Sequence, residues 1–136
     1  LSGLVGSEMC IRDRYYTIYQ NANEYPALIP QVYLHYDPHA RTWRGSNVVY
    51  THQRMDFLML LPNGIRVVIE IDGKQHYSEG DISSPKLYAE MMVDTRKLQL
   101  KGYEVYRFGG YEFMDSQQMK QTVRDFFEML FKKYSI

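Results

Sequence analysis

Three carboxylates stand close together in the segment 53–77, whose sequence is QRMDFLMLLPNGIRVVIEIDGKQHY. Asp56 lies in one apolar run, and Glu70 and Asp72 lie in the next. An acidic side chain inside an apolar strand is costly to bury unless something compensates its charge. A divalent cation would do so, because Mg²⁺ and Mn²⁺ prefer hard oxygen ligands such as carboxylates. The segment is therefore a candidate site for metal-dependent cleavage of phosphodiester bonds.

Strand periodicity decides which of these side chains share a face, since side chains alternate along a strand. In the first strand Asp56 falls on one face, and the other face carries Met55, Phe57, Met59 and Leu61. In the second strand Glu70 and Asp72 fall together, and the other face carries Ile65, Val67, Ile69 and Ile71.

The turn between the two strands sets their register. Pro62–Gly64 is typical of a tight turn, because proline fixes φ and Asn-Gly tolerates positive φ. A three-residue loop places Asp56 opposite Glu70 and Arg54 opposite Asp72. Opposed Cβ atoms lie about 4.5–5.5 Å apart, so two carboxylates there could chelate one cation. A two-residue loop would put Asp56 and Glu70 on opposite faces, so the candidate site depends on this turn.

The chain has 136 residues, enough for one domain with a core. Leu4–Arg14 matches one reading frame of a transposon-end adapter used in sequencing libraries, and the alternative is a native flexible tail. We expect residues 1–14 to be a non-native tail, and 15–136 to be a single domain from the C-terminal part of a larger protein. Cys10, the single cysteine, falls in that tail, so a disulfide framework and cysteine chemistry are excluded for the rest.

Charge and hydropathy narrow the function classes. Sixteen basic and sixteen acidic residues balance to a net charge of zero, so a strongly basic surface gives no direct argument for nucleic acid. A protein with a net charge of zero can still carry a local rim of basic side chains around an acidic centre. No apolar run approaches the roughly 18 residues of a membrane span, and no secretory signal pattern is present. We expect a cytoplasmic protein without a membrane partner.

The remaining elements are expected to surround the hairpin in the order (α)βββαβα, giving an α/β class with a central mixed sheet flanked by helices. The expected elements are the end of a helix within 15–27, strands over 31–36, 48–61 and 65–72, a helix from Ser84-Pro85 to Gly102, a strand over 104–108 and a helix from Asp115 to about Lys133. Loops are expected over 37–47 and 73–83. The apolar stripe of the first complete helix comprises Tyr88, Met91, Met92, Thr95 and Leu98, and that of the last comprises Met119, Val123, Phe126, Phe127, Leu130 and Tyr134.

Four short motifs follow one another over residues 50–113. They are RMDF at Arg54–Phe57, EIDGKQH at Glu70–His76, DTRK at Asp94–Lys97 and LQLKGYEVYRF at Leu98–Phe108. In this order and spacing the chain resembles the PD-(D/E)XK superfamily of restriction-endonuclease-like folds, and within it the branch related to very-short-patch-repair endonucleases. The segment QVYLHYDP is also similar to C-terminal domains of some abortive-infection phage-defence proteins.

The resemblance implies that Asp56 and Glu70 bind Mg²⁺ or Mn²⁺. The superfamily's lysine is expected two residues after Glu70, where this chain has Asp72. Either Asp72 replaces the lysine and His76 takes over proton chemistry, or the motif slides by two residues so that Asp72-Gly73-Lys74 serves as its D-x-K segment. We favour the first, because Gly73 is expected to end the strand. Asp72 is then a third ligand, or it pairs with Arg54.

Other polar residues have functional and ordinary interpretations. Lys74 would neutralise the phosphate, Gln75 would position the water, and His76 would act as general base or acid. Contacts to nucleic acid, with DNA favoured over RNA, are expected from four residues: Arg54, Gln75, Arg96 and Lys97. In the ordinary alternative, Lys74 is a solvated lysine and His76 is an exposed loop histidine. Asp94 then pairs with Lys97 on one helix face. The carboxylates form salt bridges to Arg54, Arg66 or Arg107.

These observations predict a divalent-metal-dependent nuclease domain, set in phage defence or DNA repair and joined to a further N-terminal domain. A second hypothesis is a catalytically silent nuclease-fold module that binds nucleic acid or a partner protein. A third is a structural domain whose carboxylates form salt bridges.

Overall fold

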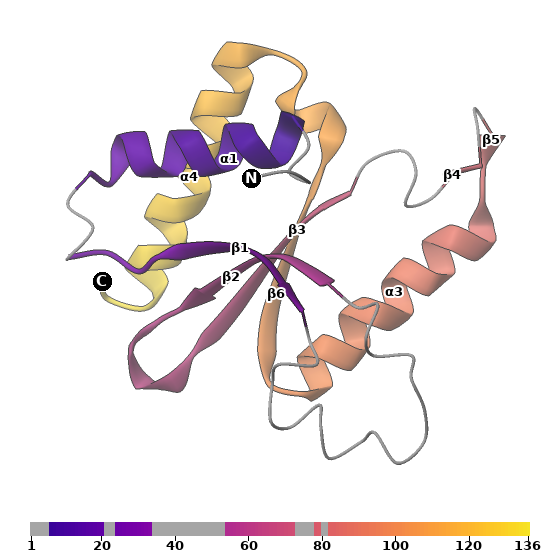
Figure 1. The fold of residues 1–136 in the computed structure, drawn as a ribbon, viewed down its shortest axis with the longest axis horizontal. Coiled ribbons are helices and arrows are strands. Elements are labelled where there is room, and N and C mark those ends of the chain that lie inside the picture. The colour runs from indigo at the N-terminus through magenta and orange to yellow at the C-terminus, as the bar shows by residue number, and fades with distance from the viewer. Residues whose placement is uncertain (1–5, 21–23, 34–53, 73–77, 80–81) are drawn as a thin grey trace.

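The computed structural model describes residues 6–20, 24–33, 54–72, 78–79 and 82–136 (Figure 1). In chain order its elements are α1 (Gly6–Ile18), β1 (Leu28–Tyr33), β2 (Arg54–Leu60), β3 (Arg66–Asp72), β4 (Ser78–Glu79), β5 (Ile82–Ser83), α3 (Pro85–Leu100), β6 (Tyr103–Gly109) and α4 (Ser116–Lys133). Short 3₁₀ turns cover Pro62–Gly64 and Gly110–Phe113.

Four strands form one mixed sheet in the order β1-β2-β3-β6. β1 and β3 each pair antiparallel with β2, and β6 pairs parallel with β3. A parallel pair needs a crossover, which α3 supplies. α1 and α4 lie together on one side of the sheet, and α3 lies on the other (Figure 1). The predicted mixed sheet flanked by helices is confirmed.

The core has a large and a small part. The large one fills the space between the sheet and helices α1 and α4, and its most buried members are Ile11, Tyr15, Leu28, Phe57, Met59, Val67, Ile69, Val123 and Phe127. The small one lies under α3 and comprises Met55, Val68, Leu98 and Tyr103. The sheet is thus held mainly from the α1–α4 side, and the α3 side carries fewer buried apolar groups.

The predicted hairpin turn and register are confirmed. Asn63 and Gly64 adopt positive φ angles of 67° and 74°, as an Asn-Gly turn allows. The Leu61 amide donates to the Ile65 carbonyl over 2.8 Å, and the ladder continues through pairs such as Leu60 with Arg66. The three-residue loop therefore sets the register that opposes positions 56 and 70.

The expected alternation of faces is wrong at one place in β2. Met55 packs in the small cluster under α3, whereas Phe57 packs in the large cluster on the other side. The change coincides with Gln31, which follows Pro30 in β1 and has a φ of 54°. A non-glycine residue at positive φ departs from extended geometry and re-aims the residues beyond it. Val32, which follows Gln31, accordingly packs with the small cluster as well.

Several element boundaries also differ from those expected. β1 begins at Leu28 rather than Gln31, and it accommodates Pro30 because an edge strand has a side that needs no amide donor. A short β4–β5 ladder lies within the loop expected over 73–83. The expected loop 37–47 and the outer parts of the strands expected over 31–36 and 48–61 lie outside the described residues.

The ends of α3 follow the sequence signals, but its expected apolar stripe is only partly correct. Ser84 caps the helix by accepting the Leu87 amide proton over 3.2 Å, and Gly102 follows the helix with a φ of 97°. Leu98 is buried as expected, whereas Tyr88 and Met92 are exposed.

The last helix follows its signals more closely. Asp115 caps α4 by accepting the Gln118 amide proton over 2.9 Å. Of the expected apolar face of α4, Val123, Phe127 and Leu130 are buried, and Phe131, which was not expected, joins them.

Helix α1 includes most of the expected non-native tail. Ile11 and Tyr15 project from it into the large core, and Cys10 is partly buried. That residues 1–14 are foreign to the native protein stays a prediction. Among the described helices, none is both long and apolar enough to span a bilayer.

Substituting Phe127 with alanine should lower the free energy of unfolding by about 3–5 kcal/mol. The ring is almost fully buried, and its centroid lies 4.6 Å from that of Tyr15. Urea unfolding would measure the loss. Glu128→Ala changes the adjacent, exposed residue and should alter stability by no more than about 0.5 kcal/mol. Equal losses in the two variants would contradict this packing.

Candidate active site

Asp56 and Glu70 are brought together where β2 and β3 cease to pair directly. The Asp56 amide donates to Glu70 Oε2 over 2.8 Å, and the Ile71 amide donates to Asp56 Oδ2 over 2.9 Å. Each carboxylate thus accepts a backbone proton from the strand of the other, just beyond the last pair of the ladder, Phe57 with Ile69. This exchange holds the two carboxylates side by side.

The pair is withdrawn from water. Asp56 is only 6% exposed, and Glu70 is partly buried. Burial, and after it the neighbouring negative charge of Asp56, raise the pKa of Glu70 to about 8. The hydrogen bond from the Asp56 amide and the charge of Arg107 oppose the increase in this pKa. A second positive charge beside the pair would let both carboxylates ionise.

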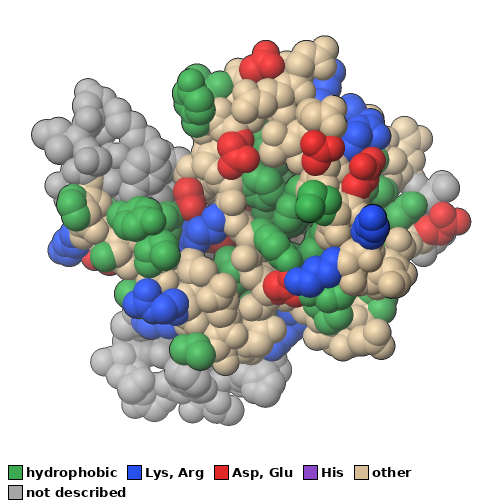
Figure 2. Space-filling model, turned by 180° about the vertical axis from the view of Figure 1, so that it is seen from behind, with side chains coloured by type: hydrophobic (Ala, Val, Ile, Leu, Met, Phe, Trp, Pro, Cys, Tyr) green, Lys and Arg blue, Asp and Glu red, His purple; other side chains and the backbone are tan. Residues whose placement is uncertain are grey.

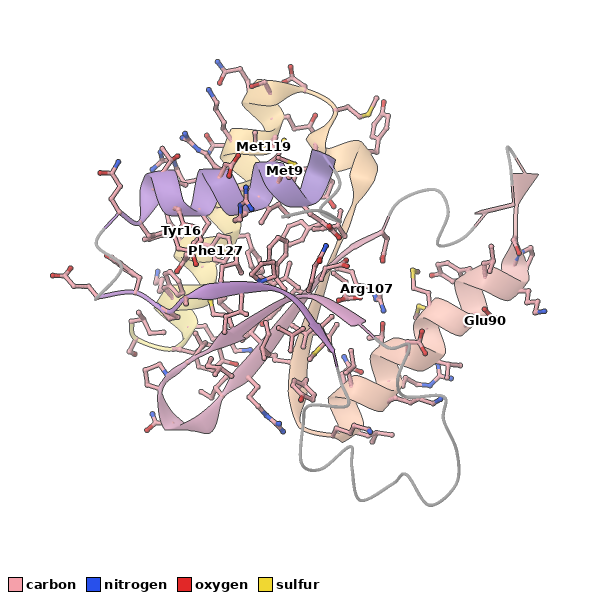
Figure 3. The ribbon with its side chains drawn as sticks, viewed as in Figure 1. Met9, Tyr16, Glu90, Arg107, Met119 and Phe127 are labelled. Carbon is pink, nitrogen blue, oxygen red and sulfur yellow. The ribbon has the colours of Figure 1, made fainter. Side chains whose placement is uncertain are left out.

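Asp72 lies on the same strand and is paired with a cation. Its Oδ1 is 2.7 Å from Nη1 of Arg107, which belongs to the parallel neighbour β6. Arg107 Nε also donates to Thr95 Oγ1 over 2.5 Å, and Nη2 donates to the Met91 carbonyl over 3.3 Å. One guanidinium therefore ties β3 and β6 to α3, and Figure 3 shows it between the strands and that helix.

Of the other strand arginines, Arg66 lies at the opposite end of β3. Its guanidinium donates to the Tyr103 hydroxyl over 3.3 Å and to the Lys101 carbonyl over 3.0 Å, and it sits 4.2 Å from the centre of the Tyr103 ring. Arg107 thus supports the salt-bridge alternative for Asp72. The backbone of Arg54 is part of β2, but its side chain lies outside the described residues.

The other predicted site residues are not assembled by what the structure describes. Arg96 and Lys97 are exposed on α3. Lys74, Gln75 and His76 lie outside the described residues, so their roles stay predictions. Within the described ranges, no three histidine, cysteine or acidic side chains form a group able to hold a metal ion.

One neighbour of the site was not expected. Gln31 lies in β1 at the level of Asp56, between the pairs Pro30 with Phe57 and Val32 with Met55. Its Nε2 is buried and, within the described part of the chain, has no hydrogen-bond partner. The sequence gives no signal for this, because a glutamine at the start of an apolar run is ordinary and its positive φ depends on the folded sheet.

Comparison with known proteins finds no similar relative: no protein-family model, curated protein or solved structure matches the chain. The case for a function therefore depends on the site itself.

The raised pKa of Glu70 predicts a pH-dependent stability. Because the folded state holds this proton more tightly than the unfolded chain, the contribution of Glu70 to stability is complete below pH 4.5 and is lost as the pH rises through about 8. Urea midpoints measured across this range should fall with pH in the wild type. In Glu70→Gln, which mimics the protonated acid, the fall should be smaller. Identical pH profiles would contradict the shift.

The Arg107–Asp72 ion pair predicts a strong coupling. Arg107→Met leaves a largely buried carboxylate without its cation and should cost roughly 3 kcal/mol of unfolding free energy. Adding Asp72→Asn removes that orphaned charge, so the double variant should lose less than the sum of the single losses. Urea unfolding of the four proteins in a double-mutant cycle measures the difference. Additive losses would show that the pair is not coupled.

Proposed function

We propose that this chain is a divalent-metal-dependent nuclease domain with a restriction-endonuclease-like fold, acting on DNA in phage defence or DNA repair. The observation that carries the proposal is the Asp56–Glu70 pair. A buried and a partly buried carboxylate are held side by side by hydrogen bonds to each other's strands, although their charges repel. A structure that needed only packing would gain by replacing either acid with an apolar residue.

The donor set fits Mg²⁺ or Mn²⁺. Both residues supply carboxylate oxygens, the ligand type these ions favour. Each uses one oxygen for a backbone hydrogen bond, Oδ2 in Asp56 and Oε2 in Glu70, which fixes the orientation of the group. Glu70 Oε1 accepts no hydrogen bond from any residue that the structure describes. The site therefore presents hard oxygen atoms whose mutual repulsion a cation would relieve.

The roles of the protein groups follow from this placement. Asp56 and Glu70 would hold the ion, and Asp72 would lie beside them on the same strand as Glu70, engaged by Arg107. A bound ion of this kind lowers the pKa of a water molecule and stabilises negative charge on a phosphodiester. Arg107 would position Asp72, because its guanidinium fixes that carboxylate relative to α3.

The remaining predicted groups complete the proposed nuclease. His76 would move the proton, Lys74 would neutralise phosphate charge and Gln75 would orient the attacking water. Arg54, Arg96 and Lys97 would contact the nucleic acid backbone, and exposed positions for Arg96 and Lys97 suit that contact. The mixed sheet with α1 and α4 on one side and α3 on the other is compatible with the proposed fold.

One observation favours the silent-module alternative. The position two residues after Glu70, where the superfamily has its lysine, holds an aspartate that is already engaged by Arg107. A module that has lost catalysis would keep the fold and this ion pair, and would bind nucleic acid or a partner protein without cutting.

Thermal unfolding with added Mn²⁺ tests the site and separates the alternatives. A ligand that binds only the folded state stabilises it by about 2.7 kcal/mol at a hundred times its Kd. Mn²⁺ should raise the unfolding midpoint of the wild type but not of Asp56→Asn or Glu70→Gln. Glu90→Gln, an exposed acid on α3 (Figure 3), is the matched control and should respond like the wild type.

Cleavage of a DNA substrate should then follow the same pattern. Both site variants should lose at least about 100-fold in rate, the scale expected when a group that stabilises transition-state charge is removed. Wild-type cleavage by Glu70→Gln would refute the assignment. A Mn²⁺ response combined with salt-dependent DNA binding and no cleavage would support the silent module.

A further inference from the structure

The β6 strand forms one edge of the described sheet. β6 pairs with β3 along its length and is last in the order β1-β2-β3-β6. An edge strand offers a row of backbone donors and acceptors that another strand can pair with, and proteins usually protect such edges. β6 carries Glu104 and Arg107, but the surface between this strand and α4 is largely apolar.

A hollow of about 290 Å³ lies between β6 and α4 beside this edge. Its lining is almost wholly apolar and comprises Tyr106, Phe126, Met129, Leu130 and the stem of Lys133. Met129 is 72% exposed although it lines this apolar surface. Figure 2 shows hydrophobic side chains gathered near the middle of this face, with acidic and basic side chains around them.

Two further apolar residues stand at the ends of β6. Leu100 ends α3 just before the strand and is 86% exposed, and Tyr111 follows the strand and is 82% exposed. If two copies of β6 pair antiparallel about Tyr106, Leu100 of each copy lies near Tyr111 of the other. Exposed apolar groups of this size mark association surfaces when they lie in one patch.

The charges on α4 are self-complementary about Met129. Asp125 lies four residues before Met129 and Lys133 lies four residues after it, so all three share one face of the helix. Two antiparallel α4 helices that meet at Met129 bring Asp125 of each copy opposite Lys133 of the other. Lys133 already donates to Glu104 over 2.6 Å, which holds its ammonium group at the edge of the hollow.

We propose that the β6 edge and the adjoining face of α4 form a two-fold interface with a second copy of this chain. A two-fold axis perpendicular to the sheet joins the two β6 strands into one continuous sheet and leaves both α4 helices on the same side of it. The hollow of each copy is then covered by α4 of the other. This inference is independent of the proposed nuclease function, since no site residue takes part.

Sedimentation velocity on the full chain over a concentration series tests the interface. The wild type should shift from monomer to dimer with rising concentration. Met129→Glu and Met129→Lys should each weaken dimerisation at least tenfold, because the two-fold axis brings like charges together. Leu60→Glu changes an exposed apolar residue in β2, away from this edge, and should dimerise like the wild type.

The decisive measurement is a mixture of the two charged variants. Because residue 129 of one copy meets residue 129 of the other, an equimolar mixture of Met129→Glu and Met129→Lys should recover a dimer that neither variant forms alone. Thermal midpoints equal to that of the wild type, at a concentration where the wild type is monomeric, would show that both variants are folded. A wild type that stays monomeric at every concentration, or a mixture that fails to associate, would overturn the proposal.

Discussion

The repulsion between two carboxylates that are largely withdrawn from water is the constraint that the rest of this structure accommodates. Asp56 and Glu70 lie on neighbouring strands, and burial and mutual repulsion both disfavour their ionised forms. What keeps them together is backbone geometry, because each accepts an amide proton from the other's strand. That geometry exists only if the register of β2 and β3 is exact, since a slip of one residue would move one carboxylate to the other face.

The second requirement is that the end of the sheet that carries the acidic residues be fixed to α3, the helix that covers it. Few buried apolar groups lie under α3, so packing alone holds this helix weakly. Arg107 supplies polar contacts instead, joining Asp72 to Thr95 and to the Met91 carbonyl. A cation that already neutralises one carboxylate thus also positions the helix over the candidate site. Removing it would both loosen α3 and leave the site with a larger uncompensated negative charge.

The parts of this arrangement that are encoded locally could be predicted from the sequence. The turn at Pro62–Gly64 follows from residue types with particular φ preferences, and it fixes the opposition of positions 56 and 70. The caps at Ser84 and Asp115 likewise follow from side chains that bond to nearby amides. The mixed sheet flanked by helices could likewise be predicted, from the periodicity of apolar residues in short segments.

What could not be predicted depends on tertiary contacts. The positive φ of Gln31, and with it the change of face at Met55, arises where strand β1 meets β2, and no local signal marks it. Arg107 reaches Asp72 because β6 pairs parallel with β3, a choice that sequence periodicity does not fix.

Strand β6 shows how one element can serve two surfaces without coupling them. Successive side chains point to opposite faces, so Arg107 reaches the site under α3 while Tyr106 lines the hollow beside α4. The sheet between these two surfaces is a closely packed layer of buried side chains, among them Val67, Val68 and Ile69. Association through the α4 side would therefore leave the α3 side of the sheet uncovered by the second copy. Alternation along a single strand is thus sufficient to let neighbouring residues of β6 border a charged site on one face of the sheet and an apolar hollow on the other.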